Sequence, residues 1–165
     1  GGILNLPDWG ARATSQEVVV YEAVLTLHSL LRWLVVLGVA FVLVRALVAR
    51  FSTSAWKGSD TALMRATTVM FDVQLVLGLA LLVYLSPIAA AAFRDFGAAM
   101  KDETLRFFSV EHTTLMLAAL AFAHVGSARV KRAQQAELQA KRATLWFALT
   151  AICLAFGVPW WRGWL

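Results

Sequence analysis

Three histidines are the side chains of this chain best suited to cofactor chemistry. His28 lies in TLHSLLRWLVV, His112 in VEHTTLMLAAL and His124 in AFAHVGSARV, so each lies inside or at the edge of an apolar stretch. Neutral imidazole is a common axial ligand of haem iron and of other metals. An ionisable residue inside a membrane segment is also a functional candidate, because its burial is costly. The height of each histidine in its helix therefore decides which of them can share a ligand.

The composition indicates that these helices cross a membrane. The 165 residues are 60% hydrophobic and have a mean hydropathy of +0.69. A helix needs about 20 mostly apolar residues to span roughly 30 Å of hydrocarbon, and four stretches meet or approach this length: 18–48, 66–93, 107–128 and 143–161. We predict one all-α domain over residues 1–165, an integral membrane four-helix bundle, with segment 1–17 lying on the membrane surface.

The distribution of charge predicts the orientation of this bundle. Basic residues flank the first and third connections: Arg45, Arg50, Lys57, Arg65, Arg129, Lys131, Arg132, Lys141 and Arg142. Cytoplasmic loops carry such an excess of Lys and Arg. We therefore expect a multi-pass protein of a bacterial inner membrane with both termini on the outer, periplasmic side. The net charge of +5 is then a sign of topology, and nucleic acid is not an expected partner.

Spacing from the basic residues places two histidines at one height. His28 precedes Arg45 by 17 residues, and His112 precedes Arg129 by the same 17. At about 1.5 Å per residue each lies roughly 25 Å above the cytoplasmic edge. The pair is therefore placed to bind one b-type haem from opposite faces, with Arg32 one turn below His28 available to a propionate or to Glu111.

Other interpretations of these residues remain open. His28, Arg32, Glu111 and His112 also suit a polar cluster that joins two helices by pairing of its members. A different metal or a chlorophyll-type pigment, whose central Mg accepts one imidazole, is a further alternative.

A second polar set is predicted near the inner edge of the membrane. His124 lies five residues before Arg129, and Asp72 lies seven residues after Arg65. These spacings place the two side chains roughly 7 to 10 Å above the cytoplasmic edge. We expect a buried pair with Gln74 as a third partner. It suits either a helix-to-helix hydrogen bond, or a proton path or quinone headgroup site.

Four motifs carry a resemblance to a known family. HSLLRW, QLVLGL, MKDETLRFFSVEH and GVPWW occur in this order, one on each apolar stretch. The chain after about Tyr21 resembles small bacterial four-helix membrane proteins often labelled cytochrome b or cytochrome b-like. The resemblance implies a small redox-associated or accessory subunit with five residues at motif positions: His28, Arg32, Gln74, Glu111 and His112. The chain departs from the family pattern HxQLxLGL, because Asp72 stands at the position of its histidine.

Two functions follow as predictions. No nucleotide-binding or hydrolase motif is present, so the chain is not expected to be an enzyme by itself. The first function is a membrane-embedded subunit of an electron-transfer complex that binds one haem b through His28 and His112, with other membrane subunits, lipids and quinone as partners. The alternative is an accessory subunit of a larger respiratory or photosynthetic complex that binds lipids or pigment without haem.

Overall fold

The computed structural model describes residues 14–162, which form a bundle of long helices. Of these residues 88% are helical, and no strand occurs among them. Four helical stretches in this part of the chain are long and apolar enough to cross a membrane: Ser15–Phe51, Gly58–Leu85, Glu103–Lys131 and Ala136–Gly157. This confirms the prediction of an all-α bundle that contains four helices of membrane-spanning length. The prediction for the surface segment falls almost entirely on residues 1–13, outside the described residues.

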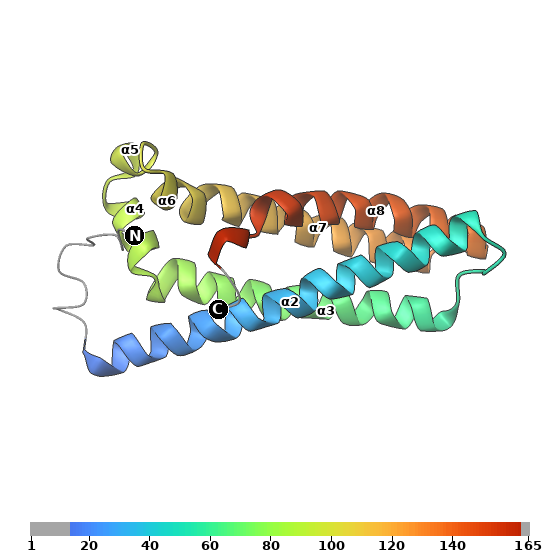
Figure 1. The fold of residues 1–165 in the computed structure, drawn as a ribbon, viewed down its shortest axis with the longest axis horizontal. Coiled ribbons are helices and arrows are strands. Elements are labelled where there is room, and N and C mark those ends of the chain that lie inside the picture. Colours follow the sequence, from blue (N-terminus) through green and yellow to red (C-terminus); the bar gives the residue numbers. More distant parts are fainter. Residues whose placement is uncertain (1–13, 163–165) are drawn as a thin grey trace.

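The four long helices run alternately up and down and pack in a ring (Figure 1). Helix α2 (Ser15–Phe51) packs mainly against α3 (Gly58–Ala80) and α8 (Ala136–Gly157), and α7 (His112–Lys131) packs against the same two helices. Helices α2 and α7 are therefore diagonal to each other. Side chains on α2 and α7 can meet only across the interior of the bundle.

The second and third long helices each contain a π-helical turn. Segment η1 (Leu81–Leu85) continues α3, and segment η2 (Phe107–Glu111) joins the short α6 (Glu103–Arg106) to α7. In η1 the backbone N–H of Ser86 donates to the carbonyl of Leu81 at 2.8 Å. Both turns lie at the end of the bundle where α2 begins (Figure 1).

The predicted helix 66–93 is divided in the structure. It begins earlier, at Gly58, and ends at Leu85, and a new helix α4 (Pro87–Arg94) follows. Ser86 has an extended backbone with ψ of 119°, because the residue before a proline is disfavoured in the α-helical region. The Ser86 hydroxyl then accepts a hydrogen bond from the N–H of Ala89 and caps α4. Together with α5 (Phe96–Ala99) and α6, helix α4 covers the end of the bundle where α2 begins (Figure 1).

Side-chain caps set the start of α2 and of α6. Thr14 and Glu17 form a capping box at the start of α2, and the Asp102 carboxylate accepts the N–H of Leu105 at 2.8 Å at the start of α6. Such caps satisfy backbone donors that have no partner within the helix. The third long helix therefore begins at Glu103, and the fourth begins at Ala136 without a side-chain cap. Both begin several residues before the apolar stretches that predicted them.

The helices pack closely at the end that carries the basic connections. Thr68 and Ser127 share a buried hydroxyl hydrogen bond of 2.8 Å between α3 and α7. A Cβ atom on Gly126 would lie 2.5 Å from Trp146 Cβ on α8, so only glycine allows this contact. Small residues permit such close approach of membrane helices. Several fully buried core side chains lie here: Val42, Ala46, Met64, Val130, Ala143 and Phe147.

An ion pair joins the first two long helices near their connection. Arg45 donates two hydrogen bonds of 2.8 Å to the Asp60 carboxylate, whose side chain is only 7% exposed. This bidentate geometry is the strongest form of an arginine and carboxylate pair. It stabilises the turn between α2 and α3, opposite the end that holds the π turns.

Candidate functional site

His28 and His112 face each other across the interior of the bundle. They come from the diagonal helices α2 and α7, and their ring centroids are 6.3 Å apart with an angle of 73° between the ring planes. Equal spacing from the basic residues predicted their height alone. The packing of the helices adds the direction of each side chain around its helix. Because α2 and α7 are diagonal, the two rings meet in the interior of the bundle.

The orientation of His112 is set by a carbonyl on the neighbouring helix. Its Nδ1 lies 2.7 Å from the carbonyl oxygen of Gly157 at the end of α8. A carbonyl accepts only, so Nδ1 carries the proton and Nε2 keeps a free lone pair. Histidines that bind metals are commonly held in this way, with the second ring nitrogen donating to a carbonyl or carboxylate. His112 is therefore prepared to offer Nε2 to a ligand.

His28 is held through its backbone carbonyl, and the Nδ1 atom of its ring forms no hydrogen bond with the described residues. Gln74 on α3 donates from Nε2 to the backbone carbonyl of His28 at 2.7 Å. His28 Nδ1 and Gln74 Oε1 are buried atoms without a hydrogen-bond partner among the described residues. Buried polar atoms are nearly always paired. His28 Nδ1 and Gln74 Oε1 are thus two polar atoms of this site that lack such pairing among the described residues.

Gly78 gives the His28 ring its place against α3. A Cβ atom on Gly78 would lie 3.3 Å from His28 Cε1, which is tighter than ordinary van der Waals contact. A larger side chain would push the imidazole away from α3. Glycine at this position thus keeps room for the ring, one turn above Gln74.

A cavity of about 160 Å³ surrounds the two imidazoles. It is only partly enclosed, and all four long helices and the final turn η3 (Trp160–Arg162) contribute to its wall. Arg32, 8% exposed, and Arg162 bring two positive charges to it. The rest of the wall is mostly apolar and includes Leu25, Val35, Phe71, Leu82, Ile88, Phe108, Met116 and Leu154.

Both π turns border this cavity. Leu81 and Leu82 of η1 and Phe108 of η2 line it, and His112 closes η2 by donating its backbone N–H to the carbonyl of Phe107. Each π turn adds one residue to a helical turn, and such turns occur frequently at functional sites. The rings of Phe107 and Phe108 lie 6.1 and 6.3 Å from the His112 ring and shield it at the end of the bundle.

Glu111 does not take part in this site, contrary to the prediction. Its carboxylate accepts a hydrogen bond of 2.7 Å from Arg106 Nε on the outside of the bundle, where it is 44% exposed. Glu111 and His112 are adjacent, and adjacent helical residues point roughly 100° apart. The predicted cluster of Glu111 with Arg32 and the two histidines is therefore not formed.

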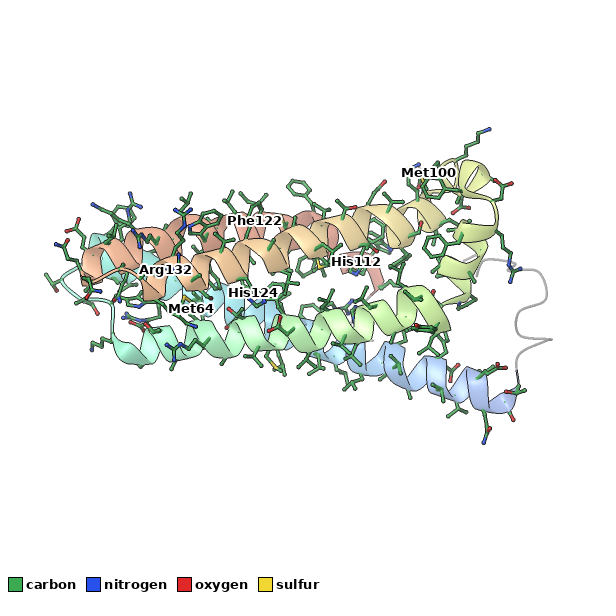
Figure 2. All side chains as sticks on the ribbon, turned by 180° about the vertical axis from the view of Figure 1, so that it is seen from behind. Met64, Met100, His112, Phe122, His124 and Arg132 are labelled. Carbon is green, nitrogen blue, oxygen red and sulfur yellow. The ribbon has the colours of Figure 1, made fainter. Side chains whose placement is uncertain are left out.

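The second predicted set is formed only in part. His124 and Asp72 make a hydrogen bond of 2.7 Å, but both side chains are 49% exposed, so the expectation of a buried pair is wrong. Gln74 belongs to His28 instead, since residues two apart on a helix point about 200° apart. Figure 2 shows His124 well separated along α7 from His112, toward the Arg132 end.

Three parts of the site were not predicted from the sequence: the Gly157 carbonyl, Arg162 and Gly78. The Gly157 carbonyl leaves no signal in a sequence, because every residue has one. Arg162 and Gly78 are not among the site residues predicted from the sequence. Their place beside the histidines depends on the helix order and on the fold of the chain after α8.

Comparisons of this chain with protein-family models, with curated proteins and with solved structures find no match. The resemblance of its motifs to cytochrome b-like proteins therefore stays a prediction.

Proposed function

We propose that this chain is a membrane-embedded electron-transfer subunit that binds one b-type haem between His28 and His112. The observation that carries the proposal is the 6.3 Å between the two imidazole centroids. Imidazole nitrogen binds a transition metal at about 2.0 to 2.1 Å, as known for zinc, and the ring adds roughly 1 Å on each side. Two imidazoles on opposite sides of one metal therefore have centroids about 6 Å apart.

The chemistry of the cavity wall supports a haem. Its apolar side chains suit a macrocycle, and guanidinium groups bind carboxylates in bidentate fashion, so Arg32 and Arg162 would hold the propionates. His112 offers Nε2 because its Nδ1 donates to Gly157. A bound haem would supply a reversible one-electron couple at its iron, whose potential the ligands and their surroundings set.

The space supports a haem only after the bundle widens. A cavity of 150 Å³ in a protein core holds about one benzene, and the cavity here is of similar size, about 160 Å³. A haem is larger than this. Its binding therefore requires the apolar side chains of the wall and the turns η1 and η2 to move aside while His28 and His112 keep their separation.

The surface of the bundle supports a place in a membrane. Large apolar side chains are widely exposed on the long helices, among them Leu34, Phe41, Val44, Val69, Val76, Leu145 and Phe156. The basic connections between α2 and α3 and between α7 and α8 lie together at one end (Figure 1). By the positive-inside rule this end faces the cytoplasm of a bacterial inner membrane, and the site faces outward. Other membrane subunits and a quinone pool would then exchange electrons with it.

An optical spectrum tests the proposal. The purified chain titrated with haem should show the spectrum of a six-coordinate, low-spin haem b, and His28→Ala and His112→Ala should each lose it because one axial ligand is removed. His124→Ala is the matched control and should keep the full signal. A fully helical chain that binds no haem would refute the proposal and leave the accessory subunit as its function. An unchanged spectrum in His112→Ala would refute the ligand assignment.

A further inference from the structure

Asp72 and His124 form a second polar site, on the outside of the bundle. His124 Nε2 on α7 lies 2.7 Å from Asp72 Oδ1 on α3, and each side chain is 49% exposed. Neither residue lines the cavity around His28 and His112. Figure 2 shows His124 toward the Met64 and Arg132 end of the molecule, apart from His112.

The surroundings of this pair are apolar. Large side chains on the same stretches of α3 and α7 are exposed: Val69 at 58%, Val73 at 40%, Val76 at 66% and Val125 at 38%. In the proposed orientation Asp72 lies roughly 10 Å from the basic edge, within the hydrocarbon. An ionisable pair that faces hydrocarbon is costly and marks a functional site.

A hydrogen bond that only joins α3 to α7 does not require side chains as exposed as those of Asp72 and His124. One turn closer to the basic end, Thr68 and Ser127 join the same helices by a hydrogen bond of 2.8 Å, and both are only 6% exposed. The helices α3 and α7 are thus already connected by a buried polar contact. The Asp72 and His124 pair differs from this contact because its polar atoms are exposed on the surface of the bundle.

The chemistry of that face follows from the carboxylate. An ionised Asp72 accepts only, so His124 Nε2 carries the proton and donates it to Oδ1. Nδ1 then keeps its lone pair, and no described residue forms a hydrogen bond with it. The pair therefore offers an acceptor, strengthened by a neighbouring negative charge, to a hydroxyl group that arrives from the membrane.

We propose that Asp72 and His124 bind the hydroxyl of a membrane-soluble hydroquinone. The phenolic O–H donates to His124 Nδ1, and the aromatic ring lies on the exposed valines. The oxidised quinone has carbonyls in place of hydroxyls and cannot donate, so the site favours the reduced form. This inference goes beyond the haem site, since it names a different site and its ligand, and it does not depend on haem being bound.

Three related ligands test the hydroxyl requirement on the full chain in lipid nanodiscs. The ligands are decyl-hydroquinone, its dimethyl ether and the corresponding decyl-quinone, with anaerobic titration calorimetry with and without added haem. One net hydrogen bond predicts that hydroquinone binds about 2- to 10-fold more tightly than the other two. Equal affinities for hydroquinone and its dimethyl ether would overturn the proposal. Because the haem-free chain should show the same preference, failure of the haem proposal would not affect this result.

Variants locate the preference at the pair. His124→Phe keeps an aromatic side chain but lacks the acceptor, so its preference for hydroquinone should vanish. In Asp72→Asn the amide can donate to Nε2 and leave the proton on Nδ1, so the preference should fall. Ser127→Ala, on the same helix pair, is the control and should keep it. A preference that survives in folded His124→Phe would overturn the site assignment, and if a variant fails to fold, the three ligands on the unaltered chain decide.

Discussion

Replacing Gly157 by alanine should weaken haem binding about 10- to 100-fold, the usual cost of losing the group that orients a metal-binding histidine. The new Cβ would lie 2.5 Å from Met116 Cε and 2.8 Å from Leu115 Cβ. The end of Met116 is flexible and can turn aside, but Leu115 Cβ is attached directly to the backbone of α7. The end of α8 must therefore move away from α7 by several tenths of an ångström.

This movement carries the acceptor of His112 with it. The hydrogen bond from His112 Nδ1 to the Gly157 carbonyl is 2.7 Å long, so a shift of this size lengthens and misaligns it. The imidazole then loses both its fixed tautomer and its direction. The same overpacking should lower the free energy of unfolding by about 1 to 3 kcal/mol.

Gly126→Ala is the matched control for this change. Its Cβ would lie 2.5 Å from Trp146 Cβ, so it forces apart the same two helices and should cost a similar amount of stability. Gly126 comes two residues after His124 in α7, and Figure 2 shows His124 far from His112 along this helix. It should therefore leave the affinity for haem unchanged.

Haem titration followed by absorbance, together with thermal unfolding of both variants, separates the two effects. If Gly126→Ala weakens haem binding as much as Gly157→Ala, the loss comes from general loosening of α7 against α8. If Gly157→Ala binds haem as tightly as the unaltered chain, the carbonyl does not orient His112. Either result would refute the reasoning.

Three more measurements check separate parts of the structure. Glu111→Gln should leave the haem spectrum and affinity unchanged, because this carboxylate lies outside the cavity; a loss seen by titration would contradict its placement. Arg45→Ala should lower the free energy of unfolding by about 1 to 3 kcal/mol in a denaturation experiment, because it leaves the buried carboxylate of Asp60 without its partner; an unchanged midpoint would show that the pair contributes nothing. Lys131→Cys in a Cys153→Ala background should resist an impermeant thiol reagent added outside intact cells, and ready labelling would invert the proposed orientation.

The long helices and the heights of their side chains could be predicted from the sequence. Four apolar stretches of membrane length are visible directly, and equal spacing of His28 and His112 from basic residues places them level because the rise per residue is constant. The contact between Asp72 and His124 follows from the same arithmetic. Height along a helix depends on the number of residues between two positions, so small errors in the helix boundaries do not change it.

Direction around each helix could not be predicted in the same way. Gln74 was grouped with Asp72 by closeness in sequence, although two helical residues so spaced point to different sides. The π turn before His112 adds a further rotation that the apolar pattern does not reveal. The exposure of Asp72 and His124 depends on how α3 and α7 meet, which only the packed bundle determines.

The two π turns lie at one end of the bundle, and the contacts between small residues described above lie at the other. We therefore expect the two ends to differ in stiffness. At the basic end, contacts such as Thr68 with Ser127 and Gly126 with Trp146 hold α7 close to α3 and α8, so we expect this end to be the stiffer one. At the other end η1 and η2 lack regular α-helical hydrogen bonding, and they surround a cavity. A flat ligand can therefore be admitted by rearrangement of the cavity wall at this end, with His28 and His112 in place, while the basic end keeps the order of the helices, so the cost of admitting it is confined to a few turns.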